Sequence, residues 1–383
     1  MRRIRTSGNV VRLIALLTLL VGTIASRAAS PPEEKGAIKA LMHTFVAELY
    51  KMRPYLATSE SFAKPEGQKQ IASSLETVVK KIKNPPAGLK ESPGFQVSLG
   101  MLADHFQKTQ EIFKSGELEY ARVRLNATTG LCATCHMQAP NISKNSPFGG
   151  FQELDKKFNF ENANFLFVIR RYDAAMTQFD QLIGQYPKGL SSVQLDELFR
   201  RKLAVITRVQ RDFLGGRDSL KKDLGNEKIP TDIRRNVEVW IEWLTKQGSR
   251  SAKPEAMPTD GLLKFVTGQM PKEPNRKISA GDPQLGNLLY LSGLLYERLY
   301  QEPNSPRAQE ILYNLALCER SLSPVDWYSV SEIYLKECIV RYPKKSFSKK
   351  CHEAYQQGMR ERYFGKPIPE SVQNSIEALK EYL

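Results

Sequence analysis

Residues 117–137 read ELEYARVRLNATTGLCATCHM, and this stretch decides how the chain is interpreted. Its apolar and small residues recur every three or four positions, which is the period of an amphipathic helix. The stripe consists of Leu118, Ala121, Leu125, Thr128, Cys132 and Cys135. The sequence therefore predicts a helix from Glu117 to about Met137 with one buried face.

Three more amphipathic helices are predicted upstream. The first, over 36–53, places six apolar residues on one face: Ile38, Leu41, Met42, Phe45, Leu49 and Met52. The second covers 66–83 and ends at an Asn-Pro-Pro-Ala-Gly sequence, and the third covers 94–115 and ends at Ser115-Gly116. Four such helices joined by short connections predict an up-down-up-down four-helix bundle.

The sequence after this bundle is predicted to be helical as well. A stretch rich in Pro, Gly, Asn and Ser supplies a linker, placed at 141–160. Beyond it, the segments 170–187, 292–322 and 331–359 share a pattern in which a helix ends near a proline, a polar turn follows, and a helix with small residues begins. These segments resemble tetratricopeptide repeats. A non-repetitive helical domain is the alternative, and a Pro/Lys-rich loop is expected at 248–283.

The fold class predicted from these patterns is all-α. A four-helix-bundle domain over 29–140 is followed by a tetratricopeptide-like helical domain over 161–383.

The first 28 residues have the pattern of a secretory signal peptide. Four arginines in residues 2–12 precede the apolar run LIALLTLLVGTIA at 13–25, and small residues at Ser26 and Ala28 suit cleavage after Ala28. The run is shorter than the roughly 20 residues that span a bilayer, although an uncleaved N-terminal membrane anchor stays an alternative. We therefore expect an exported, periplasmic protein that is soluble after cleavage.

The chain is basic, with a formal charge of +15 that falls to +10 without the five arginines of the first 28 residues. A basic surface can attract acidic proteins, anionic lipid or nucleic acid. Export argues against nucleic acid and leaves a protein partner or peripheral membrane association.

Cys132-Ala133-Thr134-Cys135-His136 is a C-x-x-C-H sequence, the attachment signature of c-type haem. Two thiols three residues apart can bond the two vinyl groups of one porphyrin, and the adjacent imidazole can bind its iron. A zinc site would need a second pair of ligands, and the chain has no second C-x-x-C. A thioredoxin-like pair would start a helix after a strand, whereas this pair ends a helix. The motif predicts one covalent haem c on Cys132 and Cys135, with His136 as the proximal iron ligand.

A C-x-x-C-H sequence on the fourth helix of a bundle resembles the cytochrome c-prime family, and the resemblance covers residues 35–140. It implies a four-helix haem domain in which Cys132 and Cys135 hold the haem and His136 is its axial ligand. Family members often carry Arg or Lys shortly after the histidine, where this chain has Met137-Gln138-Ala139-Pro140. The partner of the haem propionates is therefore left unassigned.

The sixth iron position has three candidate occupants. In an up-down-up-down bundle the start of the first helix is level with the end of the fourth, and Met42 and His43 lie there. Helical phase places Met42 on the apolar face and His43 nearer the solvated side. An open or water-bound site is the third possibility. His105 is expected to have a core or surface role, and His352 is expected at the surface.

The three remaining cysteines are Cys318, Cys338 and Cys351. Cys338 and Cys351 lie symmetrically about the turn at Lys344-Lys345, which predicts a disulfide between them, with Cys318–Cys338 as the alternative.

These features predict an exported monohaem cytochrome that transfers single electrons and is not an enzyme. Its helical repeats would dock a redox protein or an assembly partner, and its oligomeric state is left open. The alternatives are a haem-based sensor or binder of a small gas such as nitric oxide, and an adaptor whose haem is structural.

Overall fold

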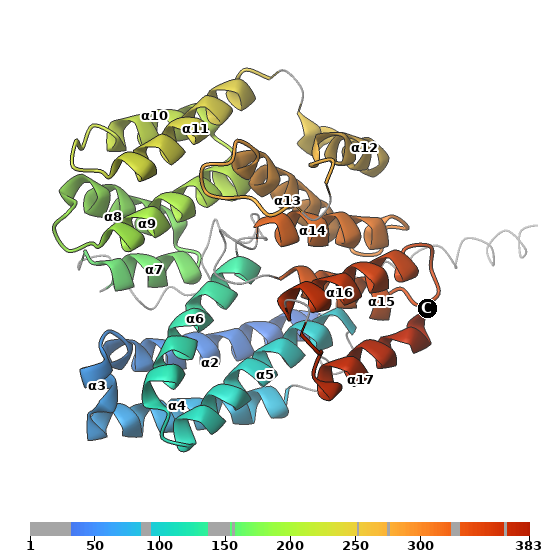
Figure 1. Ribbon diagram of the computed structural model, residues 1–383, viewed down its shortest axis with the longest axis horizontal. Coiled ribbons are helices and arrows are strands. Elements are labelled where there is room, and N and C mark those ends of the chain that lie inside the picture. Colours follow the sequence, from blue (N-terminus) through green and yellow to red (C-terminus); the bar gives the residue numbers. More distant parts are fainter. Residues whose placement is uncertain are drawn as a thin grey trace, which may run out of the picture.

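A computed structural model describes residues 32–85, 93–136, 154, 158–250, 253–273, 276–322, 330–363 and 366–383. Every regular element in these ranges is a helix, so the all-α class is confirmed (Figure 1). The signal peptide predicted at 1–28 and most of the linker predicted at 141–160 lie outside the described residues.

The N-terminal helices begin and end close to their predicted bounds. They are α2 (Pro32–Leu56), the short α3 (Ser59–Ala63), α4 (Pro65–Lys83), α5 (Pro93–Lys114) and α6 (Leu118–His136). Local signals set these bounds. Thr58 caps α3 through a reciprocal pair of hydrogen bonds with Ser61, and Pro65 occupies the first turn of α4, where no backbone donor is needed.

These helices pack in chain order, with α2 along α4, α4 along α5, and α5 along α6. The predicted apolar face of α2 is buried at Leu41, Phe45, Leu49 and Met52. One polar contact is enclosed with it, because Ser74 Oγ on α4 donates a 2.8 Å hydrogen bond to Glu48 Oε2 on α2.

The second group of helices covers the rest of the chain. It contains α7 (Phe160–Val168), α8 (Tyr172–Gln185), α9 (Ser192–Ala204), the π-helix η4 (Val205–Gln210), α10 (Phe213–Asp223), α11 (Thr231–Gly248), the 3-10 helix η5 (Pro254–Ala256), α12 (Thr259–Gln269), α13 (Gln284–Gln301), α14 (Ala308–Leu322), α15 (Ser331–Val340), α16 (Ser348–Arg362), α17 (Glu370–Ala378) and the 3-10 helix η6 (Leu379–Tyr382). Most helices pack against the next in sequence, notably α7 with α8, α13 with α14, α14 with α15, and α15 with α16.

The loop predicted at 248–283 is wrong in part, because α12 forms within it. Pro258 precedes the first residue of this helix, and Leu262, Leu263 and Val266 are buried against the neighbouring helices. The prolines that suggested a loop flank the helix instead of interrupting it, and Lys264 lies within it.

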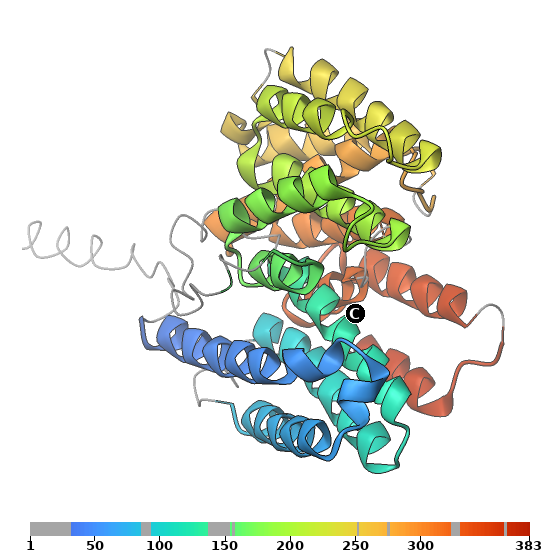
Figure 2. The ribbon, with the colours of Figure 1, turned by 90° about the vertical axis from the view of Figure 1, so that its left-hand side faces the viewer.

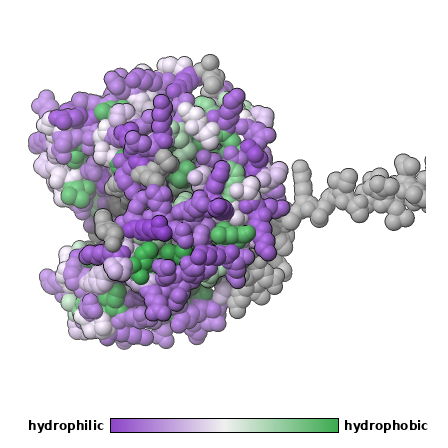
Figure 3. Space-filling view, turned by 45° about the vertical axis from the view of Figure 1, so that its right-hand side comes forward, coloured by the Kyte–Doolittle hydropathy of each residue, from purple (hydrophilic) through white to green (hydrophobic). Residues whose placement is uncertain are grey.

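The chain returns to its N-terminal helices at its end, since α15 packs against α5 and α6 packs against α7 (Figure 2). The side chain of Lys336 on α15 interacts electrostatically with Asp104 on α5. Arg53 on α2 also donates a hydrogen bond to Asn162 on α7, so the two groups meet at several places and the C-terminal helices contribute to the surroundings of α5. On the face that Figure 3 shows, apolar residues form only small, separate patches.

The predicted disulfide between Cys338 and Cys351 is confirmed. It joins α15 to α16, with the two Cα atoms 6.3 Å apart. Cys318 stays a buried thiol on α14, and burial raises its pKa well above the usual range.

The surface position predicted for His352 is wrong. Its side chain is 4% exposed, and its Nε2 lies 3.2 Å from the carbonyl oxygen of Ile376 on α17. A final helix that the sequence pattern did not anticipate covers this histidine.

Candidate functional site

The C-x-x-C-H sequence occupies the last turns of α6, as predicted. The stripe that leads to it is buried in its middle part, because Ala121, Leu125 and Thr128 are fully enclosed, whereas Leu118 is half-buried. Cys132 is half-buried and packs against the same core. The side chains of Cys135 and His136 lie outside the described residues, so these two predicted haem-binding residues are placed by their backbone alone.

The backbone of α6 places the three motif residues within about one turn of each other. Residues three and four apart on an α-helix share a face, and four residues span about 6 Å along the axis. Cys132, Cys135 and His136 therefore belong to one side of the end of α6. Two thiols and an imidazole on one helical face are a donor set that fits a covalently bound haem.

α5 fixes the helix that carries this motif. His105 Nε2 and Thr128 Oγ1 are 2.8 Å apart, and Thr128 lies one turn before Cys132. Arg124 adds a 3.0 Å hydrogen bond to Thr109 Oγ1 and a 3.1 Å hydrogen bond to the carbonyl oxygen of His105. These contacts set α5 and α6 antiparallel and in register up to the turn before the motif.

His105 lies in the core, which was one of the two positions expected for it. It is 4% exposed. Burial lowers the pKa of its imidazole to about 4, and the nearby Arg124 guanidinium contributes to the shift. The imidazole is therefore neutral at pH 7 and contacts Thr128.

The described structure places Met42 and His43 on the half-buried side of α2. Met42 packs against the core, as helical phase predicted. His43 is also half-buried, and its Nε2 atom is shielded from solvent. The solvated position expected for His43 is thus wrong for its ring nitrogen, because the neighbouring structure encloses that side of α2.

The contacts between α2 and α6 lie at the C-terminal end of α2. Arg122 Nη1 and Asn126 Nδ2 donate to the carbonyl oxygen of Leu56 at 3.0 and 3.4 Å. Counted from there, His43 is about 20 Å along α2 and His136 is about 15 Å along α6. The two distances are similar, but α6 crosses α2 at a steep inclination in both ribbon views (Figures 1 and 2). Similar distances from a steep crossing do not place two residues at one level, so the position of Met42 and His43 opposite the motif stays a prediction.

No protein-family model, curated protein or solved structure matches the chain at a significant level. None of the described helices is long and apolar enough to cross a membrane. The described side chains, which do not include those of Cys135 and His136, contain no group of three His, Cys, Asp or Glu placed to hold a metal ion.

A cluster of buried charges on α9 has no counterpart among the residues predicted from sequence. α9 directs Arg201 and Lys202 inward, and both are almost fully buried. Lys202 pairs with Asp180 and with Asp223, and Arg201 pairs with Glu197. Glu197 is four residues before Arg201 and could be found from helical period, whereas the partners of Lys202, Asp180 and Asp223, lie on other helices and could not.

Proposed function

We propose that this protein is an exported c-type cytochrome that carries one covalent haem and transfers single electrons. The observation that carries the proposal is the C-x-x-C-H sequence on the last turns of α6, at the end of a buried stripe that includes Cys132. Haem attachment requires both cysteines and the histidine at this spacing, and the chain has all three.

In this proposal Cys132 and Cys135 hold the haem through thioether bonds, and His136 binds its iron. The bound haem supplies a centre that gains and loses one electron. The chain's own part is to hold the end of α6 in place. Two hydrogen bonds between α5 and α6 do this: His105 contacts Thr128, one turn before Cys132, and Arg124 donates to the carbonyl oxygen of His105. A rigid ligand helix keeps the iron ligation unchanged between the two oxidation states.

The finer fold belongs to the same proposal. α2, α4, α5 and α6 would form the cytochrome c-prime-like four-helix bundle, which is supported by their order of packing and by the antiparallel register of α5 and α6. The helix pairs from α7 onward would form the tetratricopeptide-like array, which is supported by the packing of successive helices. We assign this array the docking of an acidic redox protein, because the exported chain is basic.

The sixth ligand decides between electron transfer and gas binding. A methionine or histidine ligand keeps the iron six-coordinate, whereas an open position binds small gases. Met42 stays our first candidate because it lies on the core side of α2, and the shielded Nε2 of His43 makes that residue a stronger second candidate than the sequence indicated.

Optical spectra of the oxidised protein test this assignment. A charge-transfer band typical of methionine ligation should be present and should be lost in Met42→Ala but not in His43→Ala. A low-spin spectrum that changes only in His43→Ala would reassign the ligand to His43. A high-spin spectrum unaffected by both substitutions would contradict both ligands and favour the gas-binding alternative.

A further inference from the structure

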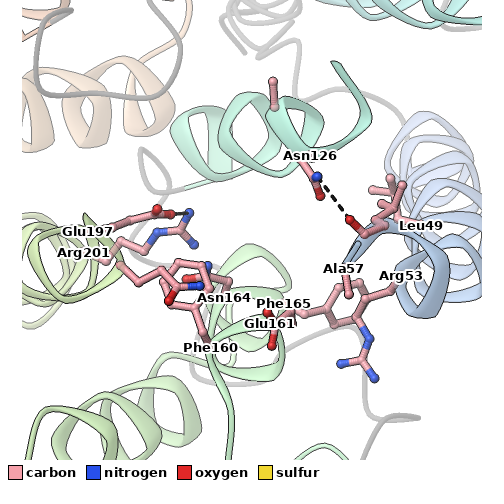
Figure 4. Close-up of a pocket in the computed structure, with 13 residues that line it drawn as sticks. Leu49, Arg53, Ala57, Asn126, Phe160, Glu161, Asn164, Phe165, Glu197 and Arg201 are labelled. Atoms are coloured by element: carbon pink, nitrogen blue, oxygen red, sulfur yellow. Dashed lines mark hydrogen bonds and ion pairs between the residues drawn. The ribbon is translucent and has the colours of Figure 1, made fainter. Parts of the chain in front are cut away.

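A cavity of about 400 Å³ lies where the N-terminal helices meet the second group, between α2, α6, α7 and α9 (Figure 4). Its volume is in the range of pockets that hold small molecules, about 300–1,000 Å³. The cavity does not include the predicted haem motif, because its lining residues on α6 are Asn126 and Ala127, about one and a half turns before Cys132.

The lining carries two positive and two negative side chains. Arg201 is 1% exposed, contacts Glu197 through Nη2, and lies against the Phe167 ring. Arg53 stands on the opposite side, and Glu161 lies between them (Figure 4). The charges balance, so the cavity favours neither a simple anion nor a simple cation.

A buried guanidinium is the positive pole of this cavity. Arginine presents five N–H donors in a planar fork that matches the two oxygens of a carboxylate. Because Arg201 is enclosed, its attraction for a carboxylate is screened little by water, and a ligand carboxylate would share this guanidinium with Glu197.

Asn164 and Glu161 form the negative pole. The Oδ1 atom of Asn164 is shielded from solvent, and none of the described residues donates a hydrogen bond to it. A buried acceptor of this kind is costly unless a donor reaches it. Asn126, by contrast, donates to the carbonyl oxygen of Leu56, so its amide holds α2 to α6.

Apart from Gln194, whose Oε1 accepts a hydrogen bond from the backbone N–H of Ser191, the rest of the lining is apolar. It consists of Leu49, Leu56, Ala57, Ala127, Phe160 and Phe165. A ligand that satisfies all three regions has a carboxylate, a nitrogen donor and a hydrocarbon side chain.

We propose that this cavity binds a free amino acid with an apolar side chain. The carboxylate is held by Arg201, the ammonium group donates to Asn164 Oδ1 and faces Glu161, and the side chain packs on Phe160 and Phe165. The site is independent of the haem proposal, since none of these residues belongs to the C-x-x-C-H motif.

Calorimetric titration of the full exported chain with leucine and phenylalanine tests the proposal. We expect saturable binding of one amino acid per chain. 4-Methylpentanoate lacks the ammonium group of leucine and 3-methylbutylamine lacks its carboxylate, so each should bind at least about 10-fold more weakly, as expected for loss of a hydrogen bond to a charged group. No binding of either amino acid at millimolar concentration would overturn the proposal. Binding of 4-methylpentanoate or 3-methylbutylamine with the same affinity as leucine would overturn it too.

Two substitutions locate the site. Asn164→Leu removes the buried acceptor and should weaken leucine binding by about 10-fold or more without lowering the melting temperature. Glu161→Gln changes an exposed side chain and should weaken binding up to about 5-fold. Asn374→Leu, on the exposed face of α17, is the matched control and should leave binding unchanged. If Asn164→Leu does not fold, the Glu161→Gln variant and the analogues decide. Leucine binding that is unchanged in Glu161→Gln, together with analogues that bind as tightly as leucine, overturns the proposal.

Discussion

The buried His105 makes the stability of the α5–α6 pair depend on pH. Its imidazole is enclosed beside Thr128, and burial together with Arg124 lowers its pKa from 6.5 to about 4. In the unfolded chain the histidine takes up a proton near its ordinary pKa, whereas in the folded chain it stays neutral until about pH 4. The unfolded state therefore binds more protons between these two values, and the folded state loses stability as the pH falls through them.

The size of the effect follows from the two pKa values. The stability from this histidine is present above pH 6.5 and is lost toward pH 4. A shift of one pKa unit corresponds to about 1.4 kcal/mol, so the loss between pH 7 and pH 4 is about 3 kcal/mol. His105→Gln keeps a group that can hydrogen-bond Thr128 but cannot titrate, and it should remove this part of the pH dependence.

Hydrogen–deuterium exchange of peptides from α5 and α6, followed across urea concentrations, gives the local free energy of unfolding. The wild-type chain should lose about 3 kcal/mol more than His105→Gln between pH 7 and pH 4. Thr128→Ser keeps the hydroxyl and is the matched control, so it should retain the wild-type pH dependence. Equal pH dependence in the wild type and His105→Gln would refute the reasoning.

Two other contacts give predictions of known direction. Replacing Cys338 and Cys351 together by Ser opens a loop with a sequence separation of 13 and should lower the free energy of unfolding by about 3 kcal/mol in urea denaturation. Peptide mapping of the wild type under non-reducing conditions verifies the bridge, and three free thiols among Cys318, Cys338 and Cys351 would contradict it. Glu319→Gln leaves the fully buried Arg208 without its 2.7 Å carboxylate partner and should destabilise the chain by about 3–5 kcal/mol in thermal unfolding, and a loss below about 1 kcal/mol would show that the pair is not enclosed.

The N-terminal helices could be predicted from sequence because their signals are local. The apolar period of α2 and the stop at Asn84-Pro85 act within a few residues, and the structure places both helix ends close to the predicted positions. The disulfide was predictable for the same reason, since Cys338 and Cys351 face each other across one short turn.

The features that sequence analysis missed depend on distant partners. His352 is buried because α17 covers it, and α12 forms because Leu262 and Val266 pack against other helices. Arg201 and Lys202 are buried, although charged residues at these helical positions would predict a solvent-exposed face. The motif of the candidate site was visible in the sequence, whereas the sixth ligand depends on how α2 and α6 cross.

The most direct test of the central claim is the mass and the optical spectrum of the purified protein after acid–acetone extraction. The account predicts that one haem per chain stays attached, that the pyridine haemochrome spectrum is that of haem c, and that replacing both Cys132 and Cys135 by Ala abolishes it. A colourless chain, a haem removed by the extraction, or zinc bound in its place would contradict the account.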